Sequence, residues 1–195
     1  MSRLGIEIPN HLPMIEDDDD LKPRDKDAVV GRIAALGHVI GMGYTKNTGP
    51  IIDSIERYGL WPHIYPRERE RLEDSDKISE QDAIDFTWFC ECAYALAWCL
   101  KILPLDPSRG CPDNLADLTV PGHPPDEFAE GKEMRPLTEI QQEADFYYCL
   151  HWYERNCGLT GQDGLLGQSA AWERRRALDW VIGVSEDWYE IPGDT

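Results

Sequence analysis

The stretch Phe86–Leu103, with the sequence FTWFCECAYALAWCLKIL, constrains the fold most, because Glu91 is its only acidic residue. On an α-helix with about 3.6 residues per turn, two tryptophans and this glutamate share one stripe. The opposite side is also apolar, and a helix that is apolar all round belongs in a protein core. Glu91 should therefore be buried, where an unpaired carboxylate is too costly to keep. We predict that Glu91 has a charged partner, a raised pKa or a chemical role.

Helical signals continue along the rest of the chain. Ser79 is a good N-cap, and Asp82 three residues later completes a capping box. These residues predict a central helix from about Glu80 to Leu103, ending before Pro104. Apolar spacing predicts further helices over 27–42, 51–58, 66–74, 138–156 and 170–182. The sequence thus predicts an all-α fold, a single irregular helical domain of five to six helices around the apolar helix at about 79–103.

At 195 residues, one domain with a sizeable core is the expectation. Residues 1–24 are predicted to form an acidic irregular N-terminal arm, and residues 25–195 the helical domain. A long irregular loop rich in proline and glycine is expected at 104–135. It has room for single turns near 113–118 and 125–131, and for a short strand around Leu118–Val120. The highly charged helix at 66–74 is expected on the surface.

The net charge of −18 limits the classes of partner. Binding to nucleic acid or to anionic membranes needs a basic surface, so neither is expected. A basic protein partner would be attracted, although acidity can also serve solubility alone. No clean apolar run of about 20 residues is present, so no membrane span is expected.

The six cysteines include no CxxC pair, and the start, MSRLGIEIPN, has no signal-peptide pattern. We therefore expect a reduced, cytoplasmic protein. The five histidines are widely spaced, and no phosphate-binding, zinc-hydrolase or serine-hydrolase motif occurs. No metal and no cofactor are predicted.

Several charged residues occupy helix faces that should be buried. On the last helix, Glu173 and Arg174 lie within or beside the inward arc, whereas Arg175, Arg176 and Asp179 should face out. The residues that could converge in one candidate polar cluster are Arg32, Glu91, Asp145, His151, Glu173 and Arg174. Such a cluster can be a structural network of arginine-clamped carboxylates. It can also be an acid–base site with one raised carboxyl pKa or, least in keeping with the spacing, a metal site.

The aromatic residues suggest both core and surface roles. Four tryptophans at inward positions are expected in the core: Trp88, Trp98, Trp152 and Trp180. Tyr147 and Tyr148 are expected to point outward, where tyrosine favours protein contacts. The candidate binding residues are these two tyrosines and the acidic run Glu16, Asp17, Asp18, Asp19 and Asp20.

An ordered series of segments resembles a known family: DKDAVVGRIAALGHVIGMGY, TWFCECAYALAWCLKIL, RPLTEIQQEADFYYCLHWYERNCG, ERRRALDWVIG and DWYEIPGDT. They are similar, in that order, to the bacterial family called domain of unknown function 4272, over about Asp25 to the C-terminus. The matching positions are Arg32, Glu91, Arg135-Pro136, Asp145, His151-Trp152, Glu173-Arg174, Ala177-Leu178, Trp180 and Asp194-Thr195. The family usually has an arginine before the central glutamate, where this chain has Phe89-Cys90. The resemblance implies a helical fold and marks polar positions without naming a reaction.

Two functional classes remain open on these observations. The first, and favoured, class is a non-catalytic acidic protein that docks or neutralises a basic protein partner, as immunity proteins do. The second is a hydrolase-like enzyme that uses Glu91 with Asp145, His151 or Glu173 as acid and base. The sequence sets no oligomeric state.

Overall fold

The computed structural model describes residues 4–6, 12, 21–113, 115, 124 and 127–193, and within them the regular secondary structure is all helical, with no strand. The all-α prediction is therefore confirmed. Four short 3-10 turns named here accompany the helices: η2 (Trp61–His63), η3 (Ser75–Lys77), η5 (Glu127–Ala129) and η6 (Trp188–Glu190). The α-helices are α1 (Lys26–Thr45), α2 (Gly49–Arg57), α3 (Pro66–Glu73), α4 (Glu80–Cys99), α5 (Leu137–Thr160) and α6 (Gln168–Ile182).

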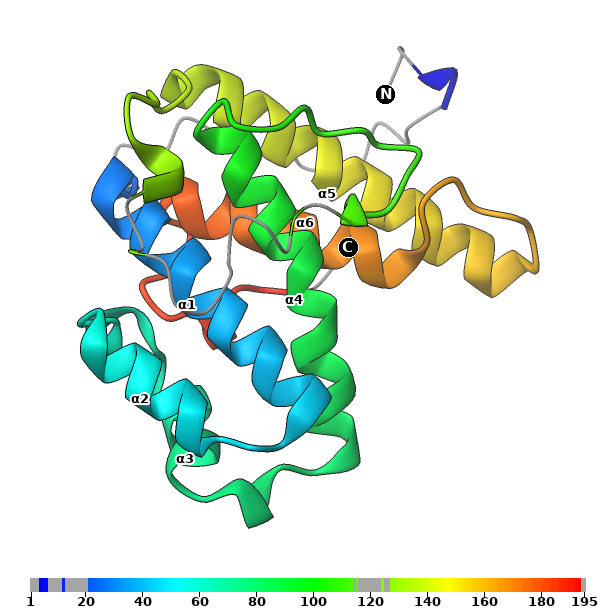
Figure 1. Cartoon of the computed structure of the whole chain (residues 1–195). Helices are drawn as coiled ribbons and strands as arrows, with labels where there is room; N and C mark the ends of the chain where they lie inside the picture. Colours follow the sequence, from blue (N-terminus) through cyan, green and yellow to red (C-terminus); the bar gives the residue numbers. More distant parts are fainter. Residues whose placement is uncertain are drawn as a thin grey trace.

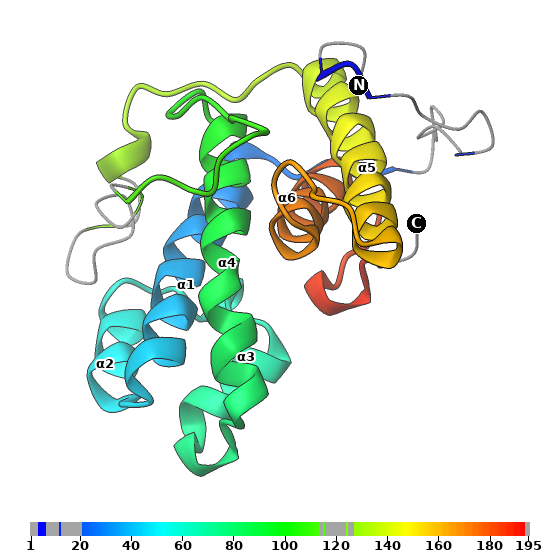
Figure 2. The same cartoon turned by 90° about the vertical axis from the view of Figure 1, so that its right-hand side faces the viewer.

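Helix α4 lies at the centre of the packing, as predicted. It packs against α1 on one side and α6 on another, and α5 in turn lies along α6. Figures 1 and 2 show α2 and α3 beside the lower halves of α1 and α4, with α5 and α6 grouped higher up. The core fills the space between α1, α4 and α6.

The capping box at the start of α4 forms as predicted, but the helix ends four residues early. Ser79 Oγ accepts a hydrogen bond from the Asp82 backbone N–H at 2.9 Å, and Asp82 Oδ2 accepts from the Ser79 N–H at 3.1 Å. The last carbonyls of the helix bind Arg135 instead of continuing the helix. The Arg135 backbone N–H donates to the Cys99 carbonyl at 2.8 Å, and its Nε donates to the Trp98 carbonyl at 2.8 Å. A residue distant in sequence thus caps the last carbonyls, while the backbone leaves the helix at Lys101, whose φ of 56° is left-handed.

Helix α5 runs past the predicted end at Asn156 to Thr160. Gly158 sits inside the helix with open space around it, so it does not break the helix. The helix ends at Gly161, whose φ of 69° is a left-handed conformation that glycine adopts without steric cost.

The turn between α5 and α6 closes around Glu154. Its buried carboxylate accepts hydrogen bonds from the backbone N–H groups of Leu165, Leu166 and Gly167 at 2.8, 2.9 and 3.0 Å. Gly167 is the N-cap of α6, and a glycine offers no side-chain cap. The carboxylate of Glu154, on the preceding helix, instead accepts the backbone N–H of this N-cap residue.

The segment just before α1 is fixed to the end of α6. The Arg24 backbone N–H donates to the Val181 carbonyl at 2.8 Å, and its guanidinium donates to the Ser185 carbonyl at 2.9 Å. At Gly183 φ is 92°, and an added Cβ would lie 2.5 Å from the carbonyl oxygen of Lys22. A glycine is required here because the two backbones approach so closely.

The predicted loop at 104–135 contains η5, within the expected turn at 125–131. The strand considered at Leu118–Val120 lies outside the described residues, as do Glu16–Asp20 and Asp194-Thr195. Among the described helices, none combines the length and the apolar character needed to cross a membrane.

Candidate functional site

The charged residues predicted to converge are divided among separate buried pairs. Of the six, Glu91 and Arg174 contact each other directly. Other members of the set take partners outside it, so the structure does not gather the six at one point. Asp145 is half-buried on α5. The buried ion pairs are Arg32–Glu68, Glu91–Arg174, Arg176–Glu173 and Arg175–Asp179.

Glu91 is buried and paired, as the sequence predicted. Arg174 Nη2 lies 2.7 Å from Glu91 Oε2, and Arg174 Nε donates to the same oxygen at 2.8 Å. The other oxygen, Oε1, accepts the backbone N–H of Cys111 at 2.9 Å. Both oxygens of the carboxylate therefore have partners, and Glu91 does not line any of the described pockets. An acid–base role for Glu91 has no support in this geometry.

Arg174 also holds the loop that follows α4. Its Nη1 donates to the Asp106 carbonyl and its Nη2 to the Arg109 carbonyl, each at 2.6 Å. Nη1 donates further to the hydroxyl of Tyr147 at 2.9 Å. Tyr147 is fully buried, so the expectation that it points outward was wrong; Tyr148 is half-buried. The buried guanidinium orders Tyr147 instead of leaving it for a partner.

Arg32 forms a second buried pair that the sequence did not suggest. Its Nη1 and Nη2 bind Glu68 Oε2 and Oε1 at 2.9 and 2.7 Å, a two-bonded geometry that arginine suits well. Its guanidinium carbon lies 4.2 Å from the ring centre of Trp188. The side chains of Arg32 and Glu68 are 1% and 0% exposed. The expectation that the charged segment 66–74 lies wholly on the surface was therefore wrong, because α1 supplies a cation for Glu68.

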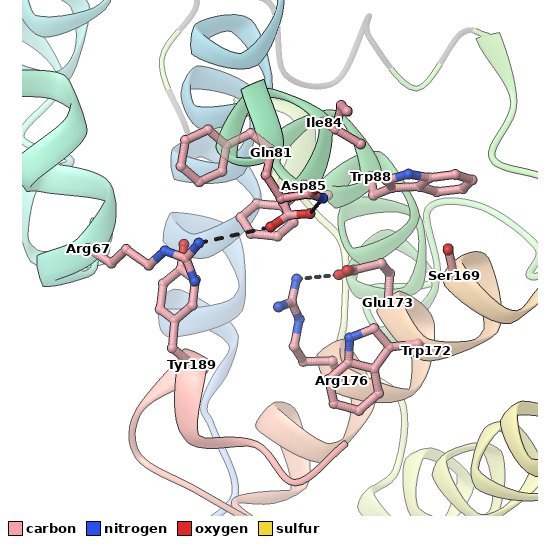
Figure 3. Close-up of a pocket in the computed structure, with 12 residues that line it drawn as sticks. Arg67, Gln81, Ile84, Asp85, Trp88, Ser169, Trp172, Glu173, Arg176 and Tyr189 are labelled. Carbon is pink, nitrogen blue, oxygen red and sulfur yellow. Dashed lines mark hydrogen bonds and ion pairs between the residues drawn. The ribbon is translucent and has the colours of Figure 1, made fainter. Parts of the chain in front are cut away.

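A pocket of about 390 Å³ opens between α3, α4, α6 and η6 (Figure 3). Of the six candidate residues, only Glu173 lines it. Its wall combines aromatic rings with arginine and carboxylate groups, the composition expected of a binding site. The lining residues are Arg67, Gln81, Ile84, Asp85, Phe86, Trp88, Phe89, Ser169, Trp172, Glu173, Arg176 and Tyr189.

The carboxylate of Glu173 is the titratable group of interest in this pocket. Its Oε2 accepts hydrogen bonds from the Cys92 thiol at 2.9 Å and from Arg176 Nη2. Burial raises the pKa of Glu173, and the charge of Arg176 opposes that shift. Burial also raises the pKa of Cys92 well above its usual value. Cys92 therefore stays a protonated donor to Glu173 and is no nucleophile.

The opposite wall of the pocket carries a surface ion-pair network. Arg67 Nη2 lies 2.9 Å from Asp82 Oδ1 and 3.9 Å from Asp85 Oδ2. Although burial alone would raise it, hydrogen bonds from Arg67 and Ser79 hold the pKa of Asp82 well below its usual range. Gln81 donates to Asp85 Oδ1 at 2.7 Å, on the side of the pocket drawn above Arg67 (Figure 3). These polar groups are positioned before any ligand arrives.

Two apolar side chains stand exposed at the rim of the pocket. Ile84 is 51% exposed and Trp88, one turn later on α4, is 40% exposed. The prediction that Trp88 belongs to the core was wrong, whereas Trp180 is buried at 4% exposure. Trp98 and Trp152 are intermediate. Ile84 and Trp88 belong to the same stripe as the buried Glu91, so the apolar face of α4 extends beyond the core.

His151 is buried in a group of its own. Its Nδ1 lies 3.4 Å from Arg175 Nη1, and its ring packs 5.5 Å from that of Trp172. Burial and the charge of Arg175 lower the pKa of His151 to about 4, so the imidazole is neutral at pH 7. Burial raises the pKa of Asp179 to about 6, against the opposing effect of Arg175. Trp172 connects this group with the lining of the pocket.

Sequence reasoning missed the burial of Arg175, Arg176 and Asp179, which it placed outward. Helix α6 is covered on both flanks, by α5 and by the C-terminal segment, so a single inward arc does not describe it. The Arg175 guanidinium lies 4.4 Å from the ring centre of Tyr148, and that of Arg176 lies 5.3 Å from Trp188. The concentration of aromatic residues around three consecutive arginines is the signal that could have indicated this arrangement.

One described group has atoms close enough to reach a single metal ion. The ligand atoms of Cys90, Glu91 and Cys111 lie within 4.8 Å of one another. Both oxygens of Glu91 already have partners, one of them the buried cation Arg174. We therefore assign no metal to this group.

A comparison with models of protein families identifies the family of this chain. A model described as Domain of unknown function (DUF4272) matches residues 1–191 of the 195. The chain belongs to this family. The match begins at residue 1, so the expectation that the resemblance starts near Asp25 was wrong. No curated protein and no solved structure matches the chain.

Membership of this family names no reaction. Several positions through which the chain resembles DUF4272 lie in the buried pairs, including Arg32, Glu91, Glu173 and Arg174. Among them, only Glu173 is also exposed to a pocket. The pocket between α3, α4 and α6 is therefore the candidate functional site of this DUF4272 chain.

Proposed function

We propose that this protein is a non-catalytic binding protein that docks a basic protein partner over the pocket between α3, α4 and α6. The observation that carries the proposal is the exposure of Ile84 and Trp88 at the rim of that pocket. Neutralisation of a basic toxin, as an immunity protein performs it, is the specific form we favour. The proposal places the protein in the cytoplasm, a reducing compartment in keeping with its six unpaired thiols.

The rim residues supply the apolar part of such an interface. Trp88 is the largest of the exposed apolar side chains, and tryptophan is enriched among residues that dominate binding energy. Ile84 lies one turn away on the same face of α4. A partner that covered both side chains would bury apolar surface beside a pocket it could fill.

Charge supplies the attraction over longer distances. The net charge of −18 favours a basic partner and faster association with it. Near the rim, Glu80 is exposed and the Asp85 side chain is 42% exposed. The pocket cations Arg67 and Arg176 are each paired with carboxylates, so they add little net positive charge there. Binding should weaken as salt concentration rises, because salt screens these charges.

Differential capture tests the proposal. The full chain and its Trp88→Ala variant are immobilised in parallel and exposed to lysate of the source organism. We expect a basic protein that binds the unmodified chain, elutes with salt and is lost from the variant. A matched control is Leu159→Ala, since Leu159 is 77% exposed and does not line the pocket. Capture that is equal on all three chains, or independent of salt, contradicts the proposal.

A hydrolase-like enzyme is the second candidate, and Glu173 is the observation that favours it. This carboxyl lines the pocket, burial raises its pKa, and a guanidinium lies beside it. A carboxyl with a raised pKa can donate a proton, and arginine can stabilise a developing negative charge. In such an enzyme Glu173, and not Glu91, would be the acid.

Activity assays on chromogenic ester, phosphoester and glycoside substrates test this candidate. We expect any hydrolysis to fall by at least about 100-fold in Glu173→Gln, the usual range for a general acid. Circular dichroism must show that the variant is folded. Equal rates for the variant and the unmodified chain would exclude Glu173 as the acid.

A further inference from the structure

Two cysteines from separate segments meet beside the Glu91–Arg174 pair. Cys90 lies on α4, and Cys111 lies in the loop that follows it. Their sulfur atoms are within 4.8 Å of each other, and the Cys90 thiol donates a hydrogen bond to the Cys111 sulfur. A disulfide would bring the two sulfur atoms from this separation to roughly 2.05 Å. The position of the two residues is independent of the docking proposed above.

The loop that carries Cys111 is held in place by contacts other than the thiols. Arg174 binds the carbonyls of Asp106 and Arg109, and Glu91 binds the Cys111 N–H. An added Cβ at Gly110 would lie 3.3 Å from Glu91 Oε1, so the backbone passes close to α4. The approach of the two sulfurs is therefore built into the fold.

Cys111 is also reachable from solvent. It is half-buried and lines a second pocket, of about 640 Å³, on the loop side of α4. The hydrogen bond from Cys90 lowers the pKa of Cys111, with help from the charge of Arg174, while burial and the neighbouring carboxylate of Glu91 oppose the shift. The same hydrogen bond and burial raise the pKa of Cys90. Of the two, Cys111 is suited to react first as a thiolate.

The other cysteines have different surroundings. Cys92, Cys99 and Cys157 are buried. Cys149 is half-buried, but burial and the charge of Asp145 raise its pKa. These thiols lack the combination of access and thiolate stabilisation found at Cys111.

We propose that Cys90 and Cys111 form a redox modification site that low-molecular-weight disulfides, of the oxidised glutathione class, convert to an intramolecular disulfide. The Cys111 thiolate attacks one sulfur of the small disulfide, forms a mixed disulfide and expels one thiolate, which takes a proton from water. Cys90 then loses its proton to solvent and attacks Cys111 Sγ, which expels the second thiol. Two protein thiols are oxidised and one small disulfide is reduced to two thiols.

The new bond joins the loop covalently to α4, next to the contact that Glu91 already makes. Reduction by a dithiol restores the two thiols and removes the covalent link, so that the hydrogen bonds alone hold the loop. The modification thus switches the wall of the second pocket between a loop held by hydrogen bonds and one held by a covalent bond.

Thiol counting after exposure to oxidised glutathione tests the proposal. The full chain is incubated with the oxidant, the small thiols are removed, and free thiols are counted in denaturant. We expect the count to fall from six to four, and dithiothreitol to restore it. Digestion after lysine and arginine, without reduction, should link the peptide of residues 78–101 to that of residues 110–132.

Variants identify the reacting pair. In Cys90→Ser, Cys111 should stop at the mixed disulfide and carry one glutathione, a product that a structural role would not give. Cys149→Ser is the matched control, and it should still lose two thiols. An unchanged thiol count in the unmodified chain, or loss of two thiols in Cys111→Ser, would overturn the proposal. So would stoichiometric binding of added Zn²⁺ that protects both sulfurs.

Discussion

Arg174 and Glu91 form a fully buried ion pair in which 2.7 Å separates Nη2 from Oε2, and this pair joins α6 to α4. The same guanidinium holds the carbonyls of Asp106 and Arg109, so the pair also fixes the loop after α4. A buried ion pair is weak evidence of net stabilisation, because both charges lose their hydration. Removal of one partner is different, since it leaves the other charge buried and uncompensated.

The substitution Glu91→Gln is accordingly expected to destabilise the protein strongly. Glutamine keeps the shape of the side chain but leaves the Arg174 charge without its counter-ion. We expect the free energy of unfolding to fall by about 3–5 kcal/mol. Urea denaturation followed by circular dichroism measures this change.

The matched control is Glu139→Gln, in the first turn of α5, where Glu139 Oε2 lies 3.1 Å from Nη1 of Arg135, a partly exposed residue just before the helix. Solvent-exposed pairs contribute at most about 1 kcal/mol, so the control should change stability little. If both variants lost the same small amount, Arg174 would have another means of neutralising its charge in the fold.

Trp88 and Trp180 offer a second comparison, between two tryptophans that the sequence treats alike. Trp88→Ala is expected to change the free energy of unfolding by less than about 1 kcal/mol, because the residue is already 40% exposed. Trp180→Ala should cost about 3–5 kcal/mol, since Trp180 is buried against Trp188 at 5.5 Å between ring centres. Denaturation of both variants checks the difference. Equal losses would mean that Trp88 is packed into the core after all.

Parts of α4 were predicted correctly from the sequence alone. Ser79 and Asp82 cap α4 as predicted because their contacts involve only residues three apart. The burial of Glu91 was likewise predicted from its own helix. Both signals are local, and the tertiary fold does not alter them.

Periodicity failed where a distant segment decides the outcome. Arg135 caps the last carbonyls of α4 from the far end of the long loop, and Arg32 pairs with Glu68 of a charged segment in the core. Helix α6 has two covered flanks, so Arg176 is buried on a face that a one-sided helix would expose. The spacing of residues along one helix cannot predict contacts with residues so distant in sequence.

Glu154, like Arg135, caps a helix to which it does not belong, and it gives a stability prediction. Its carboxylate accepts three backbone N–H groups in the turn before α6. Glu154→Gln replaces one acceptor oxygen with an N–H₂ group, which cannot accept, and it faces donors. We expect a loss of about 1.5–3 kcal/mol in the free energy of unfolding, the range for a hydrogen bond to a charged group.

Chemical denaturation tests the Glu154 prediction, with Glu186→Gln as control. Glu186 lies 3.8 Å from Lys22 on the surface, and both side chains are more than 80% exposed. No measurable change is expected in the control. A Glu154→Gln variant as stable as the control would show that water can replace the carboxylate in this turn.

The pKa of His151 predicts how stability depends on pH. The folded pKa is about 4, below the usual 6.5, so between these values the unfolded chain binds a proton that the folded chain does not. The contribution of His151 is therefore fully present above about pH 6.5 and is lost as pH falls toward 4. Asp179 acts in the opposite direction: its folded pKa is raised to about 6 from 3.8, so protonation favours the folded state over that interval.

The substitution His151→Gln isolates the histidine effect, because glutamine does not titrate and Asp179 is present in both chains. The free energy of unfolding of the unmodified protein, minus that of the variant, should decrease from pH 7.5 to pH 4.5. Urea denaturation at several pH values measures it, and the imidazole chemical shifts should give a midpoint near pH 4. A difference that stays constant with pH would mean that His151 titrates alike in both states. In that case water would reach the His151 ring beside Arg175, and the packing of this ring on Trp172 would not shield it from solvent.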